Sequence, residues 1–202
     1  MDLLIRRYNL PDISIIEKNG CGFIVWQPER DYIILGQSND VEKSLDEEEV
    51  ITDCVPVYKR PSGGDAVILT PKTLVIAKVV KQDLLKNPQA YFETFNSKVI
   101  SALNSLGVKN IETKGISDIA IGDKKIFGSS IYRSGNILFY HAVLNVNETT
   151  EKMERYLKYP QREPDYRHKR THRDFVTSLF AQGYHIDMKL LKEEITKAFC
   201  ES

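Results

Sequence analysis

A glycine turn that follows basic and hydroxyl side chains is the first candidate for chemistry in this chain. Residues 59–67 read K-R-P-S-G-G-D-A-V and continue a stretch of strand-forming residues. Successive backbone N–H groups in such a turn can form an anion-binding concavity, to which Lys59, Arg60 and the Ser62 hydroxyl would add charge and donors. A plain tight turn is the commoner explanation of the spacing alone. Neither G-x-x-x-x-G-K-[ST] nor G-x-G-x-x-G is present, so no common phosphate-binding fingerprint accounts for the turn.

A second candidate is a hairpin that carries two lysines. Residues 117–130 read S-D-I-A-I-G-D-K-K-I-F-G-S-S, and glycine in the first position of a two-residue turn predicts a type II′ hairpin. Because neighbouring strand residues face opposite ways, Lys124 and Lys125 cannot both point into one site. A fixed ammonium can stabilise charge that develops during a reaction, although a solvated lysine is the plain alternative. Asp118 could orient a cation or nucleotide, or merely cap the hairpin.

The hydrophobic pattern places these segments among further strands and helices. Large apolar residues recur at spacings of three and four from Phe92 to Leu106, which predicts a helix that begins near Pro88, ends at Gly107 and packs against the sheet. Further helices are expected over residues 41–50, 149–157, 175–181 and 187–200, the last with Asp187 as N-cap. Strands are expected over residues 21–26, 32–35, 55–58, 66–69, 73–80, 119–121, 124–130 and 137–145.

This order of elements predicts an α+β fold. Strands, one long helix, more strands and C-terminal helices favour a mixed or antiparallel sheet packed with helices over a doubly wound parallel sheet. The 202 residues contain 42% apolar and 28% charged residues, which is globular composition without an evident linker. We therefore expect residues 1–202 to form a single domain.

Charge, cysteine content and the absence of long apolar runs exclude several classes of protein. The 28 basic and 28 acidic residues balance, so no overall field attracts nucleic acid or an anionic membrane. The N-terminus lacks the order of a secretion signal, and no apolar run approaches the roughly 20 residues that span a bilayer. We expect a cytoplasmic protein. Cys21, Cys54 and Cys200 form no C-x-x-C pair, which argues against disulfides and zinc and predicts reduced thiols.

Four segments, in the same order, resemble the lipoate–protein ligase A group of the biotin/lipoate ligase and octanoyltransferase superfamily. The glycine loop of that group usually reads R-R-x-S-G-G-G-A-V, which is similar to residues 59–67. Its N-D-hydrophobic and G-K-K-I-x-G-S-A pattern is similar to residues 117–130 and places Lys125 at the lysine of the motif. The segment from His141 to Asn147 and residues 164–179 supply the other two matches.

The resemblance implies the catalytic-domain fold of biotinyl and lipoyl protein ligases, which is like that of class II aminoacyl-tRNA synthetases. It also implies that lipoate or octanoate reacts with ATP, in the presence of Mg²⁺, to give an acyl-adenylate that is then attacked by a lysine of a lipoyl carrier domain. Lys125 would be the catalytic residue. Substrate or nucleotide binding would involve Arg60, Ser62, Gly63, Gly64, Asp65, Ala66, Asp118, Gly128, Ser129, Ser130 and His141, although His141 suits a structural role better than a catalytic one.

The sequence departs from the group at two places. Asp65 replaces the third glycine, and Leu69-Thr70 stands where the group usually has His-Asp. A carboxylate about 4 Å from a triphosphate charge is repelled by about 4 kcal/mol at an effective dielectric constant of about 20, unless it binds Mg²⁺ or turns away. Asp65 and Asp118 are therefore the two candidate Mg²⁺ contacts.

Two other functions stay open. An octanoyl or lipoyl transferase that takes the acyl group from an acyl carrier protein needs a cysteine thiolate, which related enzymes place near the lysine hairpin or after the His141 strand. Residues 108–135 and 141–175 contain no cysteine, and Cys54 is expected on a buried strand. A non-catalytic subunit that binds lipoate or its carrier would suit the two departures, although retention of Lys125 argues against it. A biotin ligase is set aside because its G-R-G-R-x-G-R loop is absent.

The resemblance also implies partners. The carrier would be the glycine cleavage H protein, an E2 lipoyl domain or a similar protein. Residues 155–173 carry seven Lys/Arg and two acidic residues, which predicts either a docking edge for an acidic carrier or a solvated surface. Ligases of this group often have a C-terminal accessory domain, and the sequence to Ser202 leaves no room for one. We therefore expect a separate accessory subunit.

Overall fold

The computed structural model describes residues 3–17, 22–81 and 87–200, which form two β-sheets with helices. The larger sheet is antiparallel and has the order β2 (Gly22–Trp26), β6 (Thr73–Lys81), β10 (Ile137–Asn145), β9 (Lys124–Ser134), β8 (Asp118–Ile121) and β7 (Ile111–Lys114). The smaller sheet has the order β1 (Ile5–Arg7), β4 (Val57–Lys59), β3 (Tyr32–Leu35) and β5 (Val67–Leu69), with β4 parallel to both neighbours. The predicted α+β class is confirmed.

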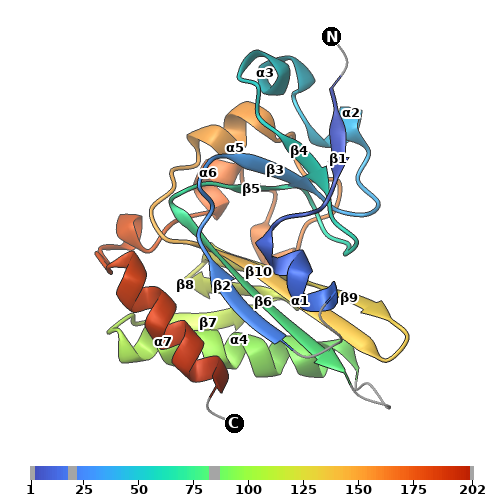
Figure 1. The fold of residues 1–202 in the computed structure, drawn as a ribbon. Coiled ribbons are helices and arrows are strands. Elements are labelled where there is room, and N and C mark those ends of the chain that lie inside the picture. Colours follow the sequence, from blue (N-terminus) through green and yellow to red (C-terminus); the bar gives the residue numbers. More distant parts are fainter. Residues whose placement is uncertain (1–2, 18–21, 82–86, 201–202) are drawn as a thin grey trace.

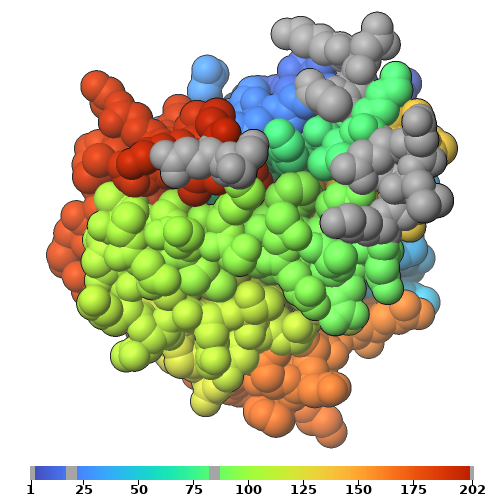
Figure 2. Space-filling model, turned by 90° about the horizontal axis from the view of Figure 1, so that it is seen from below, coloured from blue at the N-terminus to red at the C-terminus, as the bar shows by residue number. Residues whose placement is uncertain are grey.

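Two long helices cover one face of the larger sheet. α4 (Pro88–Ser105) and α7 (Met188–Cys200) lie side by side along it, and the view from below shows α4 in light green beside α7 in red (Figures 1 and 2). Their apolar faces join the strands in the largest core cluster, in which Leu103, Phe127 and Tyr140 are almost completely buried. Asp187 accepts hydrogen bonds from the N–H groups of Lys189 and Leu190, so the predicted N-cap is confirmed.

The other face of the larger sheet carries the smaller sheet (Figure 1). Tyr8, Trp26, Ile34, Leu69 and Val75 belong to one buried cluster that joins strands of both sheets. A second cluster lies beyond the smaller sheet, where four short helices complete the fold: α2 (Val41–Ser44), α3 (Glu47–Thr52), α5 (Glu151–Tyr156) and α6 (His172–Phe175). The glycine turn between β4 and β5 therefore lies where the two sheets meet.

Two predicted helices are wrong because tertiary pairing replaces helical hydrogen bonds. The helix over residues 41–50 is broken into α2 and α3, since the fully buried Leu45 forms an isolated bridge with Leu157 and the Asp46 N–H donates to the Tyr156 carbonyl. The helix over residues 175–181 is absent, because Val176 pairs with Lys125 of β9. Helical residues in that range are limited to Phe175, which ends α6, and to the start of the 3₁₀ helix η3 (Phe180–Gln182).

Several short elements were not predicted from the sequence. These are β1, β7, α1 (Ser14–Glu17), α6 and the 3₁₀ helices η1 (Pro11–Ile13) and η2 (Asp165–Arg167). Cys54 was expected on a buried strand but is an exposed free thiol in a left-handed turn (φ 52°) after α3. Cys200 is also free, and Cys21 lies outside the described residues. In the described part of the chain, no helix is both long and apolar enough to cross a bilayer.

The packing of α4 gives a stability prediction. Leu103→Ala should lower the free energy of unfolding by about 2–5 kcal/mol, because the side chain is fully buried and its removal leaves a cavity. Leu190→Ala is the matched control, since Leu190 is 44% exposed on α7 and should change stability little. Urea denaturation of both variants measures the difference, and equal losses would contradict the described packing.

Candidate functional site

The glycine turn rests directly on strand β9. Ser130 Oγ donates a hydrogen bond of 2.9 Å to the carbonyl of Gly63, and His141 pairs with Ser130 on the adjacent strand β10. Gly63 and Gly64 are exposed. Among the described residues, their backbone N–H groups donate no hydrogen bond to another protein group. The exposed side of the turn therefore offers free N–H donors, as an anion-binding site requires.

A β-bulge turns Lys125 toward the same face of the sheet. Strand β8 pairs Ile119 with Phe127 but the next residue, Ala120, with Lys125, so Ile126 has no opposite residue. In an unbroken strand Lys125 would share a face with Phe127, but the extra residue shifts the alternation. Lys125 instead reaches Gly128, where an added Cβ would lie 2.9 Å from both Cε and Nζ of the lysine. Glycine at this position makes room for the ammonium group.

Lys125 is held by an acidic partner. Its Nζ lies 2.8 Å from Asp118 Oδ1, and the Tyr166 hydroxyl donates to Asp118 Oδ2 at 2.9 Å. The Lys125 side chain is 29% exposed, whereas that of Asp118 is 9% exposed. Burial and the neighbouring Asp118 raise the pKa of Tyr166, which keeps its hydroxyl protonated as a donor. Lys124 is exposed, so only one of the two hairpin lysines contributes to this group, as predicted.

The predicted type II′ turn fits the observed hairpin. Ile121 pairs with Lys124 across the two-residue turn, and Gly122 has φ 58°. Asp123 is not in the left-handed region, and a positive φ at the first turn residue alone distinguishes type II′ from type I′.

Asp65 lies within the electrostatic field of this group. The residue is exposed, yet partial desolvation raises the pKa of its carboxyl. The positive charges of Lys125, Arg60 and Arg167 act in the opposite direction, and Asp118 adds to the increase. The carboxylate that replaces the third glycine is therefore coupled to Lys125 rather than remote from it.

Arg60 points inward, in contrast to the free phosphate-binding cation that the sequence suggested. It is 5% exposed, and burial lowers its pKa to about 10. Its Nη2 donates to the carbonyls of Gly63 and Asp65 at 2.8 and 2.9 Å, and its Nη1 donates to the carbonyl of Ile34 at 3.2 Å. The guanidinium thus binds the inner side of the glycine turn and determines its shape.

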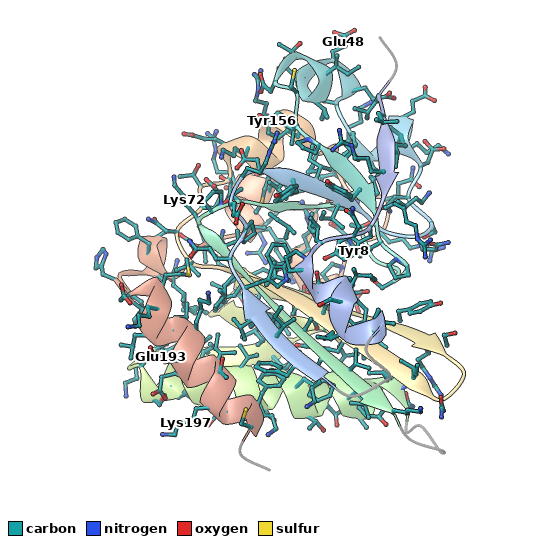
Figure 3. The ribbon with its side chains drawn as sticks, viewed as in Figure 1. Tyr8, Glu48, Lys72, Tyr156, Glu193 and Lys197 are labelled. Atoms are coloured by element: carbon teal, nitrogen blue, oxygen red, sulfur yellow. The ribbon has the colours of Figure 1, made fainter. Side chains whose placement is uncertain are left out.

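A buried chain of polar side chains continues from Arg60. Arg60 Nε donates to Ser62 Oγ at 3.1 Å, and Ser62 Oγ shares a short hydrogen bond with His141 Nε2. His141 Nδ1 lies 3.6 Å from Asp12 Oδ2, and the Tyr8 hydroxyl donates to both Asp12 oxygens at 2.7 and 2.9 Å. Burial lowers the pKa of His141 and, with Asp12, holds the pKa of Tyr8 well above its usual range. Tyr8 lies between the two sheets (Figure 3).

The loop after β3 is in close contact with the glycine turn. An added Cβ on Gly36 would lie only 1.9 Å from the carbonyl oxygen of Gly64. The Gln37 N–H donates to the Ser62 carbonyl at 2.9 Å, and Asn39 Oδ1 accepts from the Gly36 N–H at 2.7 Å. The turn is therefore supported from three directions, by β9, by Arg60 and by this loop.

The remaining predicted residues divide between the site and the core. Ser129 faces the opposite side of β9, where its Oγ donates to the Ser117 carbonyl at 2.8 Å and approaches Asn96 of α4. Ala66 packs against the cluster beyond the smaller sheet. At the position of the missing His-Asp pair, Leu69 is buried between the sheets and Thr70 Oγ1 accepts from the Lys72 N–H. Thr70 thus stabilises the turn between β5 and β6, whereas Leu69 belongs to the core.

The donor groups for a metal ion are few. No group of three or more His, Cys, Asp or Glu side chains that could hold a metal occurs in residues 3–17, 22–81 or 87–200. Both oxygens of Asp118 are already bound by Lys125 and Tyr166. Asp65 is exposed, so of the two candidate Mg²⁺ contacts it has the more accessible carboxylate.

Most basic residues of segment 155–173 are used within the protein. Arg155 pairs with Glu49 and Asp53, and Arg173 pairs with Glu154. The buried Arg167 guanidinium lies over the rings of Tyr159 and Phe175. Lys158 and Arg170 donate to backbone carbonyls. These pairings reduce the free positive charge of the predicted docking edge.

Tyr8, Asp12 and Gly36 were not predicted from the sequence to belong to the site, and Tyr166 was included only in the matching range 164–179. No short motif marks the first three, because their roles depend on contacts with residues far along the chain. The Pro11 that precedes Asp12 is a helix-start signal, and it alone could have indicated an ordered segment there.

Solved structures share this fold. The bi-partite lipoate protein ligase of Thermoplasma acidophilum superposes with a TM-score of 0.81 at 18% identity, over 100% of this chain and 83% of that chain. A lipoate-protein ligase A bound with ATP superposes with a TM-score of 0.79 at 19% identity, over 100% of this chain and 85% of that chain. The fold is therefore that of lipoate–protein ligase catalytic domains, as the resemblance implied.

Sequence comparison defines the family. The chain belongs to the lipoyl protein ligase A/B catalytic domain family, whose profile matches residues 12–200. It is 27% identical to lipoate–protein ligase 1 of Staphylococcus aureus over 158 residues, or 78% of this chain and 46% of that protein. It is 28% identical to lipoate-protein ligase A of Psychrobacter cryohalolentis over 172 residues, or 84% of this chain and 48% of that protein. The chain spans about half the length of these relatives.

The close contact at Gly36 can be tested. Gly36→Ala should lower the free energy of unfolding by about 1–3 kcal/mol, because its Cβ would collide with backbone that must shift. Gly63→Ala is the control, since nothing lies within 4 Å of an added Cβ there. Guanidinium denaturation of both variants measures the effect, and an unchanged Gly36→Ala protein would show that the two loops are not in contact.

The buried His141 gives a pH prediction. Because burial lowers its pKa in the folded protein, the unfolded chain binds the proton first as the pH falls through the ordinary histidine value of about 6.5. The free energy of unfolding should therefore decrease from about pH 7 to about pH 5, with a further contribution from His172, whose pKa burial also lowers. His141→Gln should flatten this dependence, whereas His185→Gln, at an exposed position, should not. Denaturation at a series of pH values measures the free energy of unfolding for each protein. The same pH dependence in wild type and His141→Gln would contradict the prediction that the buried His141 causes the loss of stability.

Proposed function

We propose that this chain is the catalytic part of an ATP-dependent lipoate–protein ligase. It would activate lipoate or octanoate to the acyl-adenylate and transfer the acyl group to a lysine of a lipoyl carrier domain in the cytoplasm. The observation that carries the proposal is the convergence of Lys125 with the exposed N–H groups of the glycine turn on one face of β9. The names of the curated relatives support it, as do the related structures with ATP and with lipoic acid bound.

The geometry provides two complementary sources of positive potential. The N–H groups of Gly63 and Gly64 would bind an anionic oxygen of the substrate, since the carbonyl of Gly63 is turned inward to Arg60 and Ser130. Lys125 would approach from the bulged hairpin and stabilise the charge that develops as the carboxylate attacks the α-phosphate. Its present partner Asp118 holds the ammonium group in place before the substrate arrives. The acyl-adenylate would then be attacked by the carrier lysine.

The described residues offer Mg²⁺ one accessible carboxylate at this site, that of Asp65. Mg²⁺ commonly binds one or two carboxylates together with substrate phosphates, so a complete cage of protein ligands is not required. Asp65 would hold the ion, because Asp118 is engaged by Lys125 and Tyr166. The ion would neutralise negative charge on the phosphates and would thereby offset the repulsion between Asp65 and ATP.

We also propose the kind of partner. The carrier would be an E2 lipoyl domain or the glycine cleavage H protein, in agreement with the Thermoplasma acidophilum structure, which is described as a lipoylation system of a bi-partite ligase and its E2 lipoyl domain. By the same analogy, a separate accessory subunit would complete the adenylation activity of this chain. An acyl transferase is less well supported, because Cys54 follows α3, which packs chiefly on α5, and Cys200 ends α7, which packs on α4 and β2.

The test is pyrophosphate release with ATP and lipoate or octanoate. Lys125→Ala should lower the rate about 100- to 1000-fold, because it removes charge stabilisation in the transition state. The melting temperature should also fall, because the nearly buried Asp118 loses its ion-pair partner, so the rate is measured at a temperature at which the variant is folded. Lys124→Ala is the matched control on the exposed side of the same hairpin and should retain full activity.

A second assay follows acyl transfer from preformed lipoyl-adenylate to an E2 lipoyl domain and to H protein. Transfer without pyrophosphate release in the first assay would show that the chain needs an accessory subunit for adenylation. Failure of both reactions would show that the chain lacks ligase activity. Full activity of a folded Lys125→Ala protein would refute the proposed role. Acyl transfer from a carrier thioester without ATP would favour the transferase.

A further inference from the structure

We propose that Asp12 is a positioning residue that acts through His141, Ser62 and Arg60 to fix the anion-binding side of the glycine turn. The inference rests on the proposed function for its effect on the reaction, and on the geometry alone for the arrangement of the side chains. The chain of contacts joins η1, strand β10 and the glycine turn. Asp12 is fully buried, and Ser62, Arg60 and His141 are 1%, 5% and 7% exposed.

The fixed donors at each end set the direction of the hydrogen bonds. Arg60 Nε can only donate, so Ser62 Oγ accepts from it and its own proton must go elsewhere. The short contact between Ser62 Oγ and His141 Nε2 is satisfied when Nε2 carries the lone pair. The ring proton then lies on Nδ1, which faces Asp12 Oδ2 at 3.6 Å. Tyr8 donates to Asp12 from the other side, so the carboxylate accepts from Tyr8 and attracts the Nδ1 proton.

The opposite tautomer would break this chain. With the proton on Nε2, Ser62 Oγ would face N–H donors from both Arg60 and His141, and its own proton would have no partner in the chain. The bare Nδ1 lone pair would also face the Asp12 carboxylate, which is unfavourable in a buried site. The negative charge of Asp12 therefore selects the tautomer in which Ser62 donates to His141 while it accepts from Arg60, so that the serine hydroxyl is held from both sides.

Asp12, His141 and Ser62 have the residue types of a nucleophilic triad, but the surroundings oppose that role. Ser62 is 1% exposed, and a lone pair of its Oγ accepts the Arg60 N–H. A nucleophile needs an oxygen that a substrate can reach, and the Ser62 hydroxyl is enclosed by protein. The effect of the chain is instead transmitted to Arg60, whose Nη2 holds the carbonyls of Gly63 and Asp65 inward. Inward carbonyls leave the N–H groups of the turn facing outward.

The direct test is the tautomer of His141 in the folded protein. Two-dimensional ¹⁵N–¹H spectra of ¹⁵N-histidine-labelled protein at neutral pH distinguish the Nδ1–H and Nε2–H forms without any substrate. We expect the Nδ1–H form in the wild type and a change toward Nε2–H in Asp12→Asn, whose amide can donate to Nδ1. An Nε2–H form in the wild type, or an unchanged tautomer in Asp12→Asn, would overturn the inference even if the ligase function is correct.

The effect on the reaction has its own control. Asp12→Asn should lower kcat for adenylate formation about 100-fold, because small misplacements of a binding group have effects of that order. Asp12→Glu keeps the negative charge and should therefore retain a higher kcat than Asp12→Asn. Asp187→Asn makes the same change of acid to amide at the N-cap of α7 and should retain wild-type kcat. A serine-reactive fluorophosphonate should not label Ser62. Unchanged kcat in a folded Asp12→Asn protein, or labelling of Ser62, would contradict the positioning role.

Discussion

The form of the site depends on the buried charge of Arg60, because removing a charge from water is costly unless hydrogen-bond acceptors surround it. Each donating nitrogen of its guanidinium binds the protein, to Ser62, to the Ile34 carbonyl, and to the carbonyls of the glycine turn. The turn cannot relax without leaving this charge uncompensated. Arg60 thus connects the smaller sheet with the turn, and Ser62 extends the connection to His141 of the larger sheet.

Much of the fold could be predicted from the sequence because its longest elements have strong periodic patterns. α4, β6 and β10 were expected, as was the cap of α7. The errors fall where a single tertiary contact overrides local preference. Leu45 is drawn into a bridge with Leu157, and Val176 into a bridge with Lys125, so neither segment continues as a helix. Such pairs are far apart in sequence, and a local window cannot detect them.

The candidate residues could be named from the sequence, but not their orientation. The glycine turn, Lys125 and Asp118 were candidates, and the structure pairs Lys125 with Asp118 and rests the turn on β9, the strand that carries Lys125. Arg60 was expected to face an anion and instead faces the protein, because orientation depends on the carbonyls that surround it. The bulge at Ile126 was also invisible, since ordinary alternation assigns Lys125 to the other face. Tyr8 and Asp12 carry no motif at all.

The polar chain from Tyr8 to Arg60 has a consequence for how the protein folds. Asp12 comes from one of the first segments to be synthesised, whereas His141 comes from β10, the last strand of the larger sheet to be synthesised. Contacts with such large sequence separation form slowly, because the chain must lose the conformational entropy of closing a long loop before the contacts contribute any favourable energy. A nascent chain that ends before β10 would therefore keep the bonds of Arg60 within residues 34–65 but would lack His141, the partner of Ser62. Competence to bind an anion should appear late, together with the completion of the larger sheet.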